Sequence, residues 1–366
     1  MRASRIIILI LVVVVVAMVG LYAFAVLLSP ASGGSNWNSA AGYPLQVSGT
    51  LGVAGQQCIN STAYILCIGG LDANGGPRNE VYISSAISSS SSNVSSWTLG
   101  SHQYPDNING QACVAYSGYL YCVGGTYDDN GDDVASSYYA PIGSGGALGA
   151  WSSTTAYPIP IDSHYCTAWS GYIYCVGGNN ETDGTNADAA PSNSVWYAQL
   201  SSLGIGPWDH TTAYPGSLSF PSCFGANGYI YCLGGADINS NSQSADYYAT
   251  LSSAGVGTWI ATTAYPVQET GQACAISSGY MYCVGGETAG GQSPSYTNAV
   301  YYAPVSSGGI GTWKQAGSYP LSAGTTCVIN SGYMYCVGGF DGSSVGENSA
   351  VYYSPLASFS SVTASG

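Results

Sequence analysis

The cysteines are the residues whose spacing most clearly indicates chemistry. Twelve of them occur among 366 residues, in six pairs whose members are nine positions apart. The pairs are Cys58/Cys67, Cys113/Cys122, Cys166/Cys175, Cys223/Cys232, Cys274/Cys283 and Cys327/Cys336. Zinc sites usually use cysteines about two to four positions apart, so the spacing does not favour a metal.

A two-residue hairpin would bring each pair together. In "CAISSGYMYC", a turn at Ser278-Gly279 sets Cys274 opposite Cys283 on a non-hydrogen-bonded pair, where side chains are closest. A disulfide needs Cβ atoms about 3.5–4.5 Å apart, so we expect six disulfides, with buried free thiols as the alternative. The first hairpin departs from the pattern, with Thr62-Ala63 at its turn and Leu66 where the others have tyrosine.

The densest acidic segment is "DDNGDD" at 128–133. Asp128, Asn130 and Asp132 alternate along it, and carboxylate and amide oxygens are the ligands that Ca²⁺ prefers. The segment lacks the glycine that an EF-hand loop has at its sixth position. A solvated acidic loop is therefore the simpler interpretation, and Ca²⁺ is the one cofactor that the sequence suggests.

Residues for acid–base or metal catalysis are few. The chain has three histidines: we expect His102 and His164 in loops and His210 on a strand, as ordinary polar residues. A histidine that acts as a catalyst must lie within hydrogen-bond reach of its partners, and no such set can be recognised along the chain. We expect no enzyme.

The cysteine pairs belong to a longer repeat. "SGYMYCVGG" occurs twice, at 278–286 and 331–339, and related phrases make six copies at spacings of 51 to 57 residues. Each double glycine is followed by a polar loop, an aromatic segment such as "VYYAP" and a Ser/Gly-rich connection. Five copies then have a tryptophan, with Tyr-Pro six or seven positions later: Trp97, Trp151, Trp208, Trp259 and Trp313.

This pattern resembles the kelch repeat, which is marked by a double glycine, a later tyrosine and a later tryptophan at a period near 50. The resemblance covers residues 37–366. It implies an all-β fold, a six-bladed β-propeller whose blades are four-stranded antiparallel sheets. The second strand of each blade would end in the double glycine, the third would carry the aromatic segment and the fourth the tryptophan.

The sixth copy has no tryptophan before the chain ends. A matching piece stands near the start, where Trp37 precedes Tyr43 by six positions in "NWNSAAGYP". We therefore expect the first strand of the domain to complete the last blade, which would close the ring and remove an exposed sheet edge. The alternative is a linear array of repeats with frayed ends.

The acidic residues are predicted to gather on one face. The loops between strands two and three, and those between successive blades, emerge on the same side of a propeller. They contain 17 of the 18 acidic residues, and Asp209 is the exception. The other face is built from uncharged Ser/Gly turns. The resemblance implies that the first face is a common binding surface, and its carboxylates could hold cations, basic peptides or sugar hydroxyls.

The N-terminus predicts a membrane anchor. Ile6–Leu28 is an unbroken apolar run of 23 residues preceded by Arg2 and Arg5. About 20 apolar residues cross a bilayer as a helix, and basic residues favour its cytoplasmic side. We thus expect residues 1–35 to be a cytoplasmic stub, a single-pass signal-anchor and a linker, with 36–366 as the extracytoplasmic propeller. A cleaved signal peptide, cut near Ser29-Pro30-Ala31, is the alternative.

An exterior location would also suit three glycosylation sequons, at Asn60, Asn93 and Asn180. The formal net charge of −14 argues against nucleic acid as a partner, because phosphates need Lys and Arg. Only Arg78 and Lys314 are basic beyond the N-terminal segment, so few carboxylates can be ion-paired. Acid usually unfolds a protein by protonating carboxylates that are paired in the native state. Because few such pairs can exist here, we expect the fold to persist at low pH.

These observations predict a membrane-anchored recognition or adhesion module that binds an extracellular protein or glycan through its acidic loop face. The alternative, which the resemblance supplies, is a carbohydrate-active enzyme of the sugar oxidase or mutarotase type. A structural component of the cell envelope is a third possibility.

Overall fold

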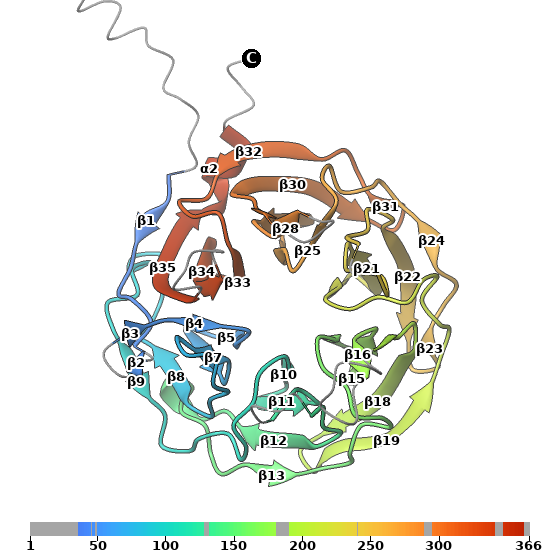
Figure 1. Cartoon of the computed structure of the whole chain (residues 1–366), viewed down its shortest axis with the longest axis horizontal. Helices are drawn as coiled ribbons and strands as arrows, with labels where there is room; N and C mark the ends of the chain where they lie inside the picture. The colour runs from blue at the N-terminus through green and yellow to red at the C-terminus, as the bar shows by residue number, and fades with distance from the viewer. Residues whose placement is uncertain are drawn as a thin grey trace, which may run out of the picture. The chain divides into compact units, whose positions relative to one another are not determined.

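The computed structural model describes residues 36–44, 46–47, 50–127, 132–180, 190–239, 241–288, 295–340 and 347–361. They belong to one compact unit, Ser35–Gly366, in which antiparallel sheets surround a central axis (Figure 1). The expected all-β architecture is confirmed. The predicted anchor lies outside the described residues, and neither helix within them, η1 (Ser144–Gly146) or α2 (Leu356–Ser361), is long and apolar enough to cross a membrane.

Six antiparallel sheets with four main strands each, here called blades 1 to 6, follow one another along the chain. Blade 1 comprises β5 (Gln57–Ser61), β6 (Tyr64–Ile68), β8 (Val81–Ser84) and β9 (Trp97–Leu99). Blade 2 comprises β10 (Ala112–Tyr116), β11 (Tyr119–Val123), β12 (Ser137–Pro141) and β13 (Ser152–Ser153). Blade 3 comprises β14 (Tyr165–Trp169), β15 (Tyr172–Val176), β18 (Val195–Ser201) and β19 (Gly204–His210). Blade 4 comprises β20 (Ser222–Ala226), β21 (Tyr229–Leu233), β22 (Tyr247–Ser252) and β24 (Ile260–Ala261). Blade 5 comprises β26 (Ala273–Ser277), β27 (Tyr280–Val284), β30 (Ala299–Ser306) and β32 (Lys314–Ser318). Blade 6 comprises β33 (Gly324–Asn330), β34 (Tyr333–Phe340), β35 (Glu347–Pro355) and β1 (Asn38–Ser39).

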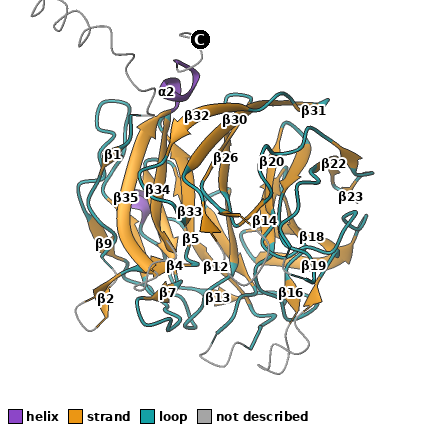
Figure 2. Ribbon diagram, turned by 45° about the horizontal axis from the view of Figure 1, so that its top comes forward, coloured by secondary structure: helices purple, strands orange, loops and turns teal. Residues whose placement is uncertain are grey.

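Short strands lie in the connections between these main strands. They are β2 (Gln46–Val47), β3 (Thr50–Leu51), β4 (Val53–Ala54), β7 (Leu71–Asp72), β16 (Asn179–Asn180), β17 (Ala190–Pro191), β23 (Gly255–Val256), β25 (Glu269–Thr270), β28 (Glu287–Thr288), β29 (Ser295–Tyr296) and β31 (Gly309–Ile310). In Figure 2, β7 and β16 lie at one edge of the ring, whereas β31 and α2 lie at the opposite edge. The two classes of loop therefore form two separate faces, as the repeat predicts.

The last blade is completed by the start of the domain, as predicted. Strand β1 pairs antiparallel with β35, with Asn38 opposite Tyr353 and Ser39 opposite Tyr352. The innermost strands of blades 6 and 1, β33 and β5, are also in contact. The ring is therefore closed, and the fourth-strand position of blade 6 is filled from the other end of the chain.

The hairpin register is also as predicted. Cys274 lies opposite Cys283, and the turn residues Ser278 and Gly279 have φ values of 51° and 78°. Positive φ at both central positions is typical of a type I′ turn, which suits the twist of the strands. The first hairpin keeps the same register, because Thr62 adopts the left-handed conformation at φ 50°.

All six predicted disulfides are formed, one in each blade. They join the first strand of a blade to its second strand, as the spacing of nine positions predicts. The bonds are Cys58–Cys67, Cys113–Cys122, Cys166–Cys175, Cys223–Cys232, Cys274–Cys283 and Cys327–Cys336. The alternative of buried free thiols is therefore wrong.

The core between neighbouring blades is aromatic. The tyrosine of each Tyr-Pro pair packs edge-on against the tryptophan of the following blade, which gives an attractive T-shaped contact. The six pairs are Tyr43/Trp97, Tyr104/Trp151, Tyr157/Trp208, Tyr214/Trp259, Tyr265/Trp313 and Tyr319/Trp37. Every blade is thus joined to its neighbour by the same side-chain contact.

A second contact between blades was not predicted from the sequence. Tyrosine hydroxyls of second strands donate hydrogen bonds to carbonyl oxygens of the next blade's turn between strands three and four, at Ser201, Ser252, Ser306 and Ser92. Blade 6 has no such turn after β35, and α2 follows there instead. Phe359 of α2 is fully buried, with ring centroids 5.7 Å from Tyr282 and 5.8 Å from Trp37.

Candidate functional site

A channel follows the central axis and opens on the acidic face. The innermost strands, such as β5, β10 and β33, surround the central axis (Figure 1). They line a central cavity of about 500 Å³. A second cavity of about 660 Å³, here called the mouth, is lined by loops between strands two and three and by loops between successive blades. The two cavities share Gly55, Gln56, Phe220, Gly271, Thr325 and Thr326.

A ring of six residues, one from each blade, lines the mouth or the central cavity. Each member stands three positions before the first cysteine of its blade: Gly55, Gly110, Ser163, Phe220, Gly271 and Gly324. Backbone hydrogen bonds connect part of this ring, from Phe220 N to Ser163 O (2.8 Å), from Ser163 N to Gly110 O (2.9 Å) and from Gly110 N to Gly55 O (3.3 Å). Gly55, Gly110 and Gly271 have φ values of 65–66°, which explains why glycine is frequent here.

Ser163 and Phe220 are the two members of this ring that are not glycine, and Phe220 is the bulky one. It adopts φ 52°, a conformation that costs a residue with a side chain roughly 1–2 kcal/mol and is rare for a bulky one. Its side chain is 48% exposed and lines the mouth instead of packing in the core. Neither burial nor backbone geometry accounts for a phenylalanine at this position.

Further apolar side chains face the same cavity from blades 4, 5 and 6. Ile238 follows β21, and the rings of Tyr296 and Phe340 lie 5.5 Å apart in a T-shaped contact. Of the described residues, eight large hydrophobic side chains are exposed, and three of these, Phe220, Ile238 and Phe340, line the mouth. Such a concentration of exposed apolar surface is typical of a binding site.

Two carboxylates complete the lining. Glu287 Oε2 accepts a hydrogen bond from the Tyr296 hydroxyl at 3.3 Å, and burial and this carboxylate raise the pKa of Tyr296. Asp237 Oδ1 accepts hydrogen bonds from the backbone of Asn241 and Asn239, and the bond from Asn241 is the main cause that lowers its pKa. Asp237 therefore stays ionised well below neutral pH.

A second ring lies one residue deeper, two positions before each first cysteine. Gln56 and Gln111 donate hydrogen bonds to Val337 O (2.8 Å) and Ile68 O (3.0 Å) of the preceding blade. At the same position in blades 3 and 5, His164 and Gln272 have no hydrogen-bond partner for either side-chain polar atom among the described residues. Both side chains line the channel.

The expectation that His164 is an ordinary polar loop residue is wrong. Its side chain is only 5% exposed, because the ring packs beneath the mouth against Tyr157, with centroids 5.5 Å apart. Burial lowers its pKa to about 3, so the imidazole is neutral at physiological pH. His164 lies close to Cys166 and Cys175, but those sulfur atoms are joined in a disulfide and are not thiolate ligands.

The second cysteine of each pair belongs to the core and not to a functional site. The predicted pairing is confirmed, but all six of these cysteines are 0% exposed and line neither cavity: Cys67, Cys122, Cys175, Cys232, Cys283 and Cys336. They lie on second strands, which are covered on both edges by the first and third strands of the blade. Reactive cysteines are partly exposed, so the chemistry that the spacing indicates is structural cross-linking alone.

Several acidic residues of the loop face are internal, which the sequence did not indicate. Glu269 is 0% exposed, and its carboxylate oxygens have no hydrogen-bond partner among the described residues. The backbone carbonyl of Glu269 lies against the double glycine of the preceding blade. In the other five blades the residue whose carbonyl makes this contact is apolar: Val53, Ile108, Ile161, Leu218 and Ala323. Burial raises the pKa of Glu269 to about 8.

Asp246 is a second internal carboxylate. It accepts hydrogen bonds from Gly234 N at 3.0 Å and Tyr265 N at 2.6 Å, and it is 2% exposed. Burial outweighs these bonds and raises its pKa to about 7. Burial is the main cause that raises the pKa of Tyr265, and the nearby carboxyl groups of Glu269 and Asp246 raise it further. Blades 4 and 5 therefore enclose two carboxyl groups that favour their neutral forms.

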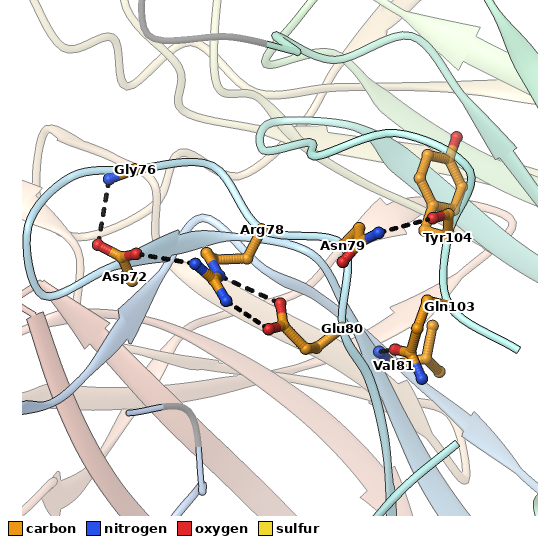
Figure 3. A network of polar contacts seen from close by, with 8 residues as sticks. All are labelled: Asp72, Gly76, Arg78, Asn79, Glu80, Val81, Gln103 and Tyr104. Carbon is orange, nitrogen blue, oxygen red and sulfur yellow. Dashed lines mark hydrogen bonds and ion pairs between the residues drawn. The ribbon is translucent and has the colours of Figure 1, made fainter. Parts of the chain in front are cut away.

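Arg78, on the same face, is already paired with acidic residues (Figure 3). Its guanidinium donates to Glu80, with 3.2 Å between Nε and Oε2, and lies 3.6 Å from Asp72 Oδ2. The hydrogen bond to Glu80 is the main cause that raises the pKa of Arg78. This cation therefore does not neutralise the carboxylates at the mouth.

The other predicted site residues are dispersed. Asp128 and Asn130 lie outside the described residues, so the calcium prediction stays a prediction, and Asp132 lies in the loop before β12. Asn93 is exposed and Asn180 half-buried in β16, whereas Asn60 lines the channel and donates a hydrogen bond to Ile329 O at 2.6 Å. Glycosylation at these positions stays a prediction.

The remaining histidines, His102 and His210, lie in the loop between blades 1 and 2 and on blade 3. His102 Nδ1 is 2.9 Å from Leu148 O, and the ring of His210 in β19 packs edge-on against Trp196. Neither side chain lines the mouth or the central cavity, so the sequence-based view of these two residues agrees with their positions.

The repeats, the six blades and one disulfide per blade define a kelch-like β-propeller. No family model matches the sequence, and no curated protein matches it. Among solved structures, the chain is similar to the one described as "Structure of YjhT", a kelch-repeat propeller protein, with a TM-score of 0.66 and 13% identity over 85% of this chain and 95% of that one. At this identity the similarity establishes the fold, and the ligand must be inferred from the site.

Proposed function

We propose that this chain is a membrane-anchored, extracytoplasmic recognition module that binds a protein or glycan ligand at the mouth of its central channel. The observation that carries the proposal is Phe220, a bulky apolar side chain held in a left-handed conformation at a position where four other blades have glycine. Strained residues that persist at a cavity commonly serve a function there.

The location rests on two features. Six disulfides indicate an oxidising, extracytoplasmic compartment, because thiols are kept reduced in the cytosol. The apolar run at 6–28 supports a membrane anchor, with the propeller outside. A recognition module at a cell surface needs an exposed binding face, and the mouth lies on the face that carries the acidic loops.

The shape and lining of the mouth support binding. A cavity of about 660 Å³ is within the usual range for ligand sites, roughly 300–1,000 Å³. Its apolar side chains supply contact area, and Asp237, Glu287 and Thr325 supply hydrogen-bonding groups. Phe220 and Phe340 come from different blades, so a ligand that fills the mouth would contact several blades at once.

The test uses the full chain displayed on cells and two variants. Phe220→Gly restores the residue type of four other blades, and Leu203→Ala truncates an apolar side chain that is 85% exposed on the opposite face. Each protein is applied to arrays of glycans and of extracellular proteins. We expect ligands of the native chain to be lost with Phe220→Gly and retained with Leu203→Ala. Ligands that bind equally well to Phe220→Gly would refute the proposal.

A turnover screen with simple sugars on the same three proteins addresses the enzyme alternative. Sugar turnover that is lost in Phe220→Gly would show that the mouth is a catalytic site instead of a recognition site. Cross-linking of intact cells addresses the structural alternative, because an envelope component would be held through the neutral face, which the Leu203→Ala variant alters.

A further inference from the structure

We infer that the group entering the mouth is the cationic side chain of a Lys- or Arg-containing segment of an extracellular protein. This inference rests on the proposed function and specifies the ligand class for the same site. It is argued from the charges and the aromatic rings at the mouth.

The charge of the mouth favours a cation. Asp237 and Glu287 both line the cavity. Beyond the N-terminal segment the only basic residues are Arg78, which is paired with Glu80 and Asp72, and Lys314, which lies on β32, the outermost strand of blade 5. A positive ligand would therefore meet carboxylates that neither of the described basic residues neutralises, whereas an anionic ligand would be repelled.

The aromatic rings supply the second element. A Lys or Arg head group is attracted to the face of an aromatic ring within about 6 Å, and Tyr296 and Phe340 form a pair of such rings beside Glu287. The apolar stem of the same side chain can pack against Phe220, which reaches the mouth from blade 4. A single Lys or Arg side chain of the ligand would thus contact the aromatic rings and the carboxylates at the same time.

Isothermal titration of the full chain in detergent distinguishes the possible ligands. The probes are tetralysine, tetraglutamate and the neutral sugar maltotetraose. The variants are Glu287→Gln, Phe220→Gly and, as a matched control, Asp209→Asn, which neutralises an exposed acid on β19 away from the mouth. We expect tetralysine alone to bind, about fivefold more weakly to Glu287→Gln and about tenfold more weakly to Phe220→Gly. Asp209→Asn should bind as the native chain does.

Other outcomes separate the inference from the proposed function. Binding of maltotetraose but not tetralysine, lost in Phe220→Gly, would overturn the cationic ligand and keep the mouth as a recognition site. Tetralysine binding that Asp209→Asn and Glu287→Gln weaken equally would reveal non-specific attraction to the acidic face and would also overturn the inference. Binding that Phe220→Gly leaves unchanged would overturn both claims.

Discussion

Trp37 packs edge-on against Tyr319, with ring centroids 4.9 Å apart, although the two residues come from opposite ends of the propeller sequence. The same contact occurs at five other places around the ring, between residues much closer in sequence. This pair therefore helps to hold β1 in the last blade, to which β1 contributes only two residues.

Replacing Trp37 by alanine should destabilise the whole propeller. Removing a large aromatic side chain from a packed site typically costs about 3–5 kcal/mol, and this one also holds β1 against β35. Denaturant unfolding followed by tyrosine fluorescence measures the change, with Leu203→Ala as the exposed control. A loss below about 1 kcal/mol would show that closure does not depend on this contact.

Removing one disulfide should weaken its blade without unfolding the ring. The Cys274→Ala/Cys283→Ala double variant opens a loop of nine-residue separation, for which chain entropy predicts a loss of about 2–3 kcal/mol. Urea unfolding of the oxidised proteins checks the value. A variant as stable as the native chain would contradict the view that these bonds stabilise the blades.

Stability should increase as the pH falls from 8 towards 4.5. Burial raises the pKa of Glu269 to about 8 and that of Asp246 to about 7, above their unfolded values of 4.5 and 3.8, so the folded state binds protons more tightly across these ranges. Each group changes the free energy of unfolding by at most about 1.4 kcal/mol per pH unit. Burial lowers the pKa of His164 to about 3, so this residue decreases the free energy of unfolding as the pH falls below 6.5.

Urea unfolding at pH 8, 6.5 and 4.5 tests this dependence. We expect a gain between pH 8 and 6.5 and a comparable one between pH 6.5 and 4.5, where protonation of unfolded His164 offsets one of the two carboxyl groups. The Glu269→Gln variant should flatten the upper part of the curve. A free energy of unfolding that decreases from pH 8 to 6.5 would contradict the buried, neutral carboxyl groups.

Replacing His164 by glutamine should stabilise the protein and extend its tolerance of acid. Gln56 and Gln111 occupy the corresponding positions and bond to the preceding blade, so the new amide can reach the equivalent carbonyl of Val123. One added hydrogen bond contributes about 1 kcal/mol, and the loss of a buried imidazole removes the destabilisation below pH 6.5. Equal or lower stability of His164→Gln at pH 4.5 would refute this reading of the ring.

The repeated parts of the fold could be predicted from the sequence because they are local or periodic. Cys274 and Cys283 are held by a two-residue turn, and Trp37 replaces the tryptophan that the sixth copy lacks. Helix α2 could not be predicted in this way, because Phe359 fills a place that a turn occupies in other blades and no second copy of its sequence exists.

The site was predicted only as a face. Counting acidic residues indicated which loops share a face, but it could not show that Glu269 is buried while Glu287 lines the mouth, since this depends on how the blades pack. A signal was nevertheless present: when the repeats are aligned on their first cysteine, Phe220 stands where three other blades have a left-handed glycine. That conformation becomes visible only in the folded ring.

Side-chain oxidation footprinting tests the central claim, that ligand binds at the mouth, most directly. Hydroxyl-radical labelling of the full chain, with and without the strongest ligand from the arrays, reports the exposure of Phe220, Phe340 and the distant Leu203 in one measurement. We predict that ligand slows oxidation of Phe220 and Phe340 and leaves Leu203 unchanged. Protection of Leu203 with unaltered oxidation of Phe220 would contradict the account.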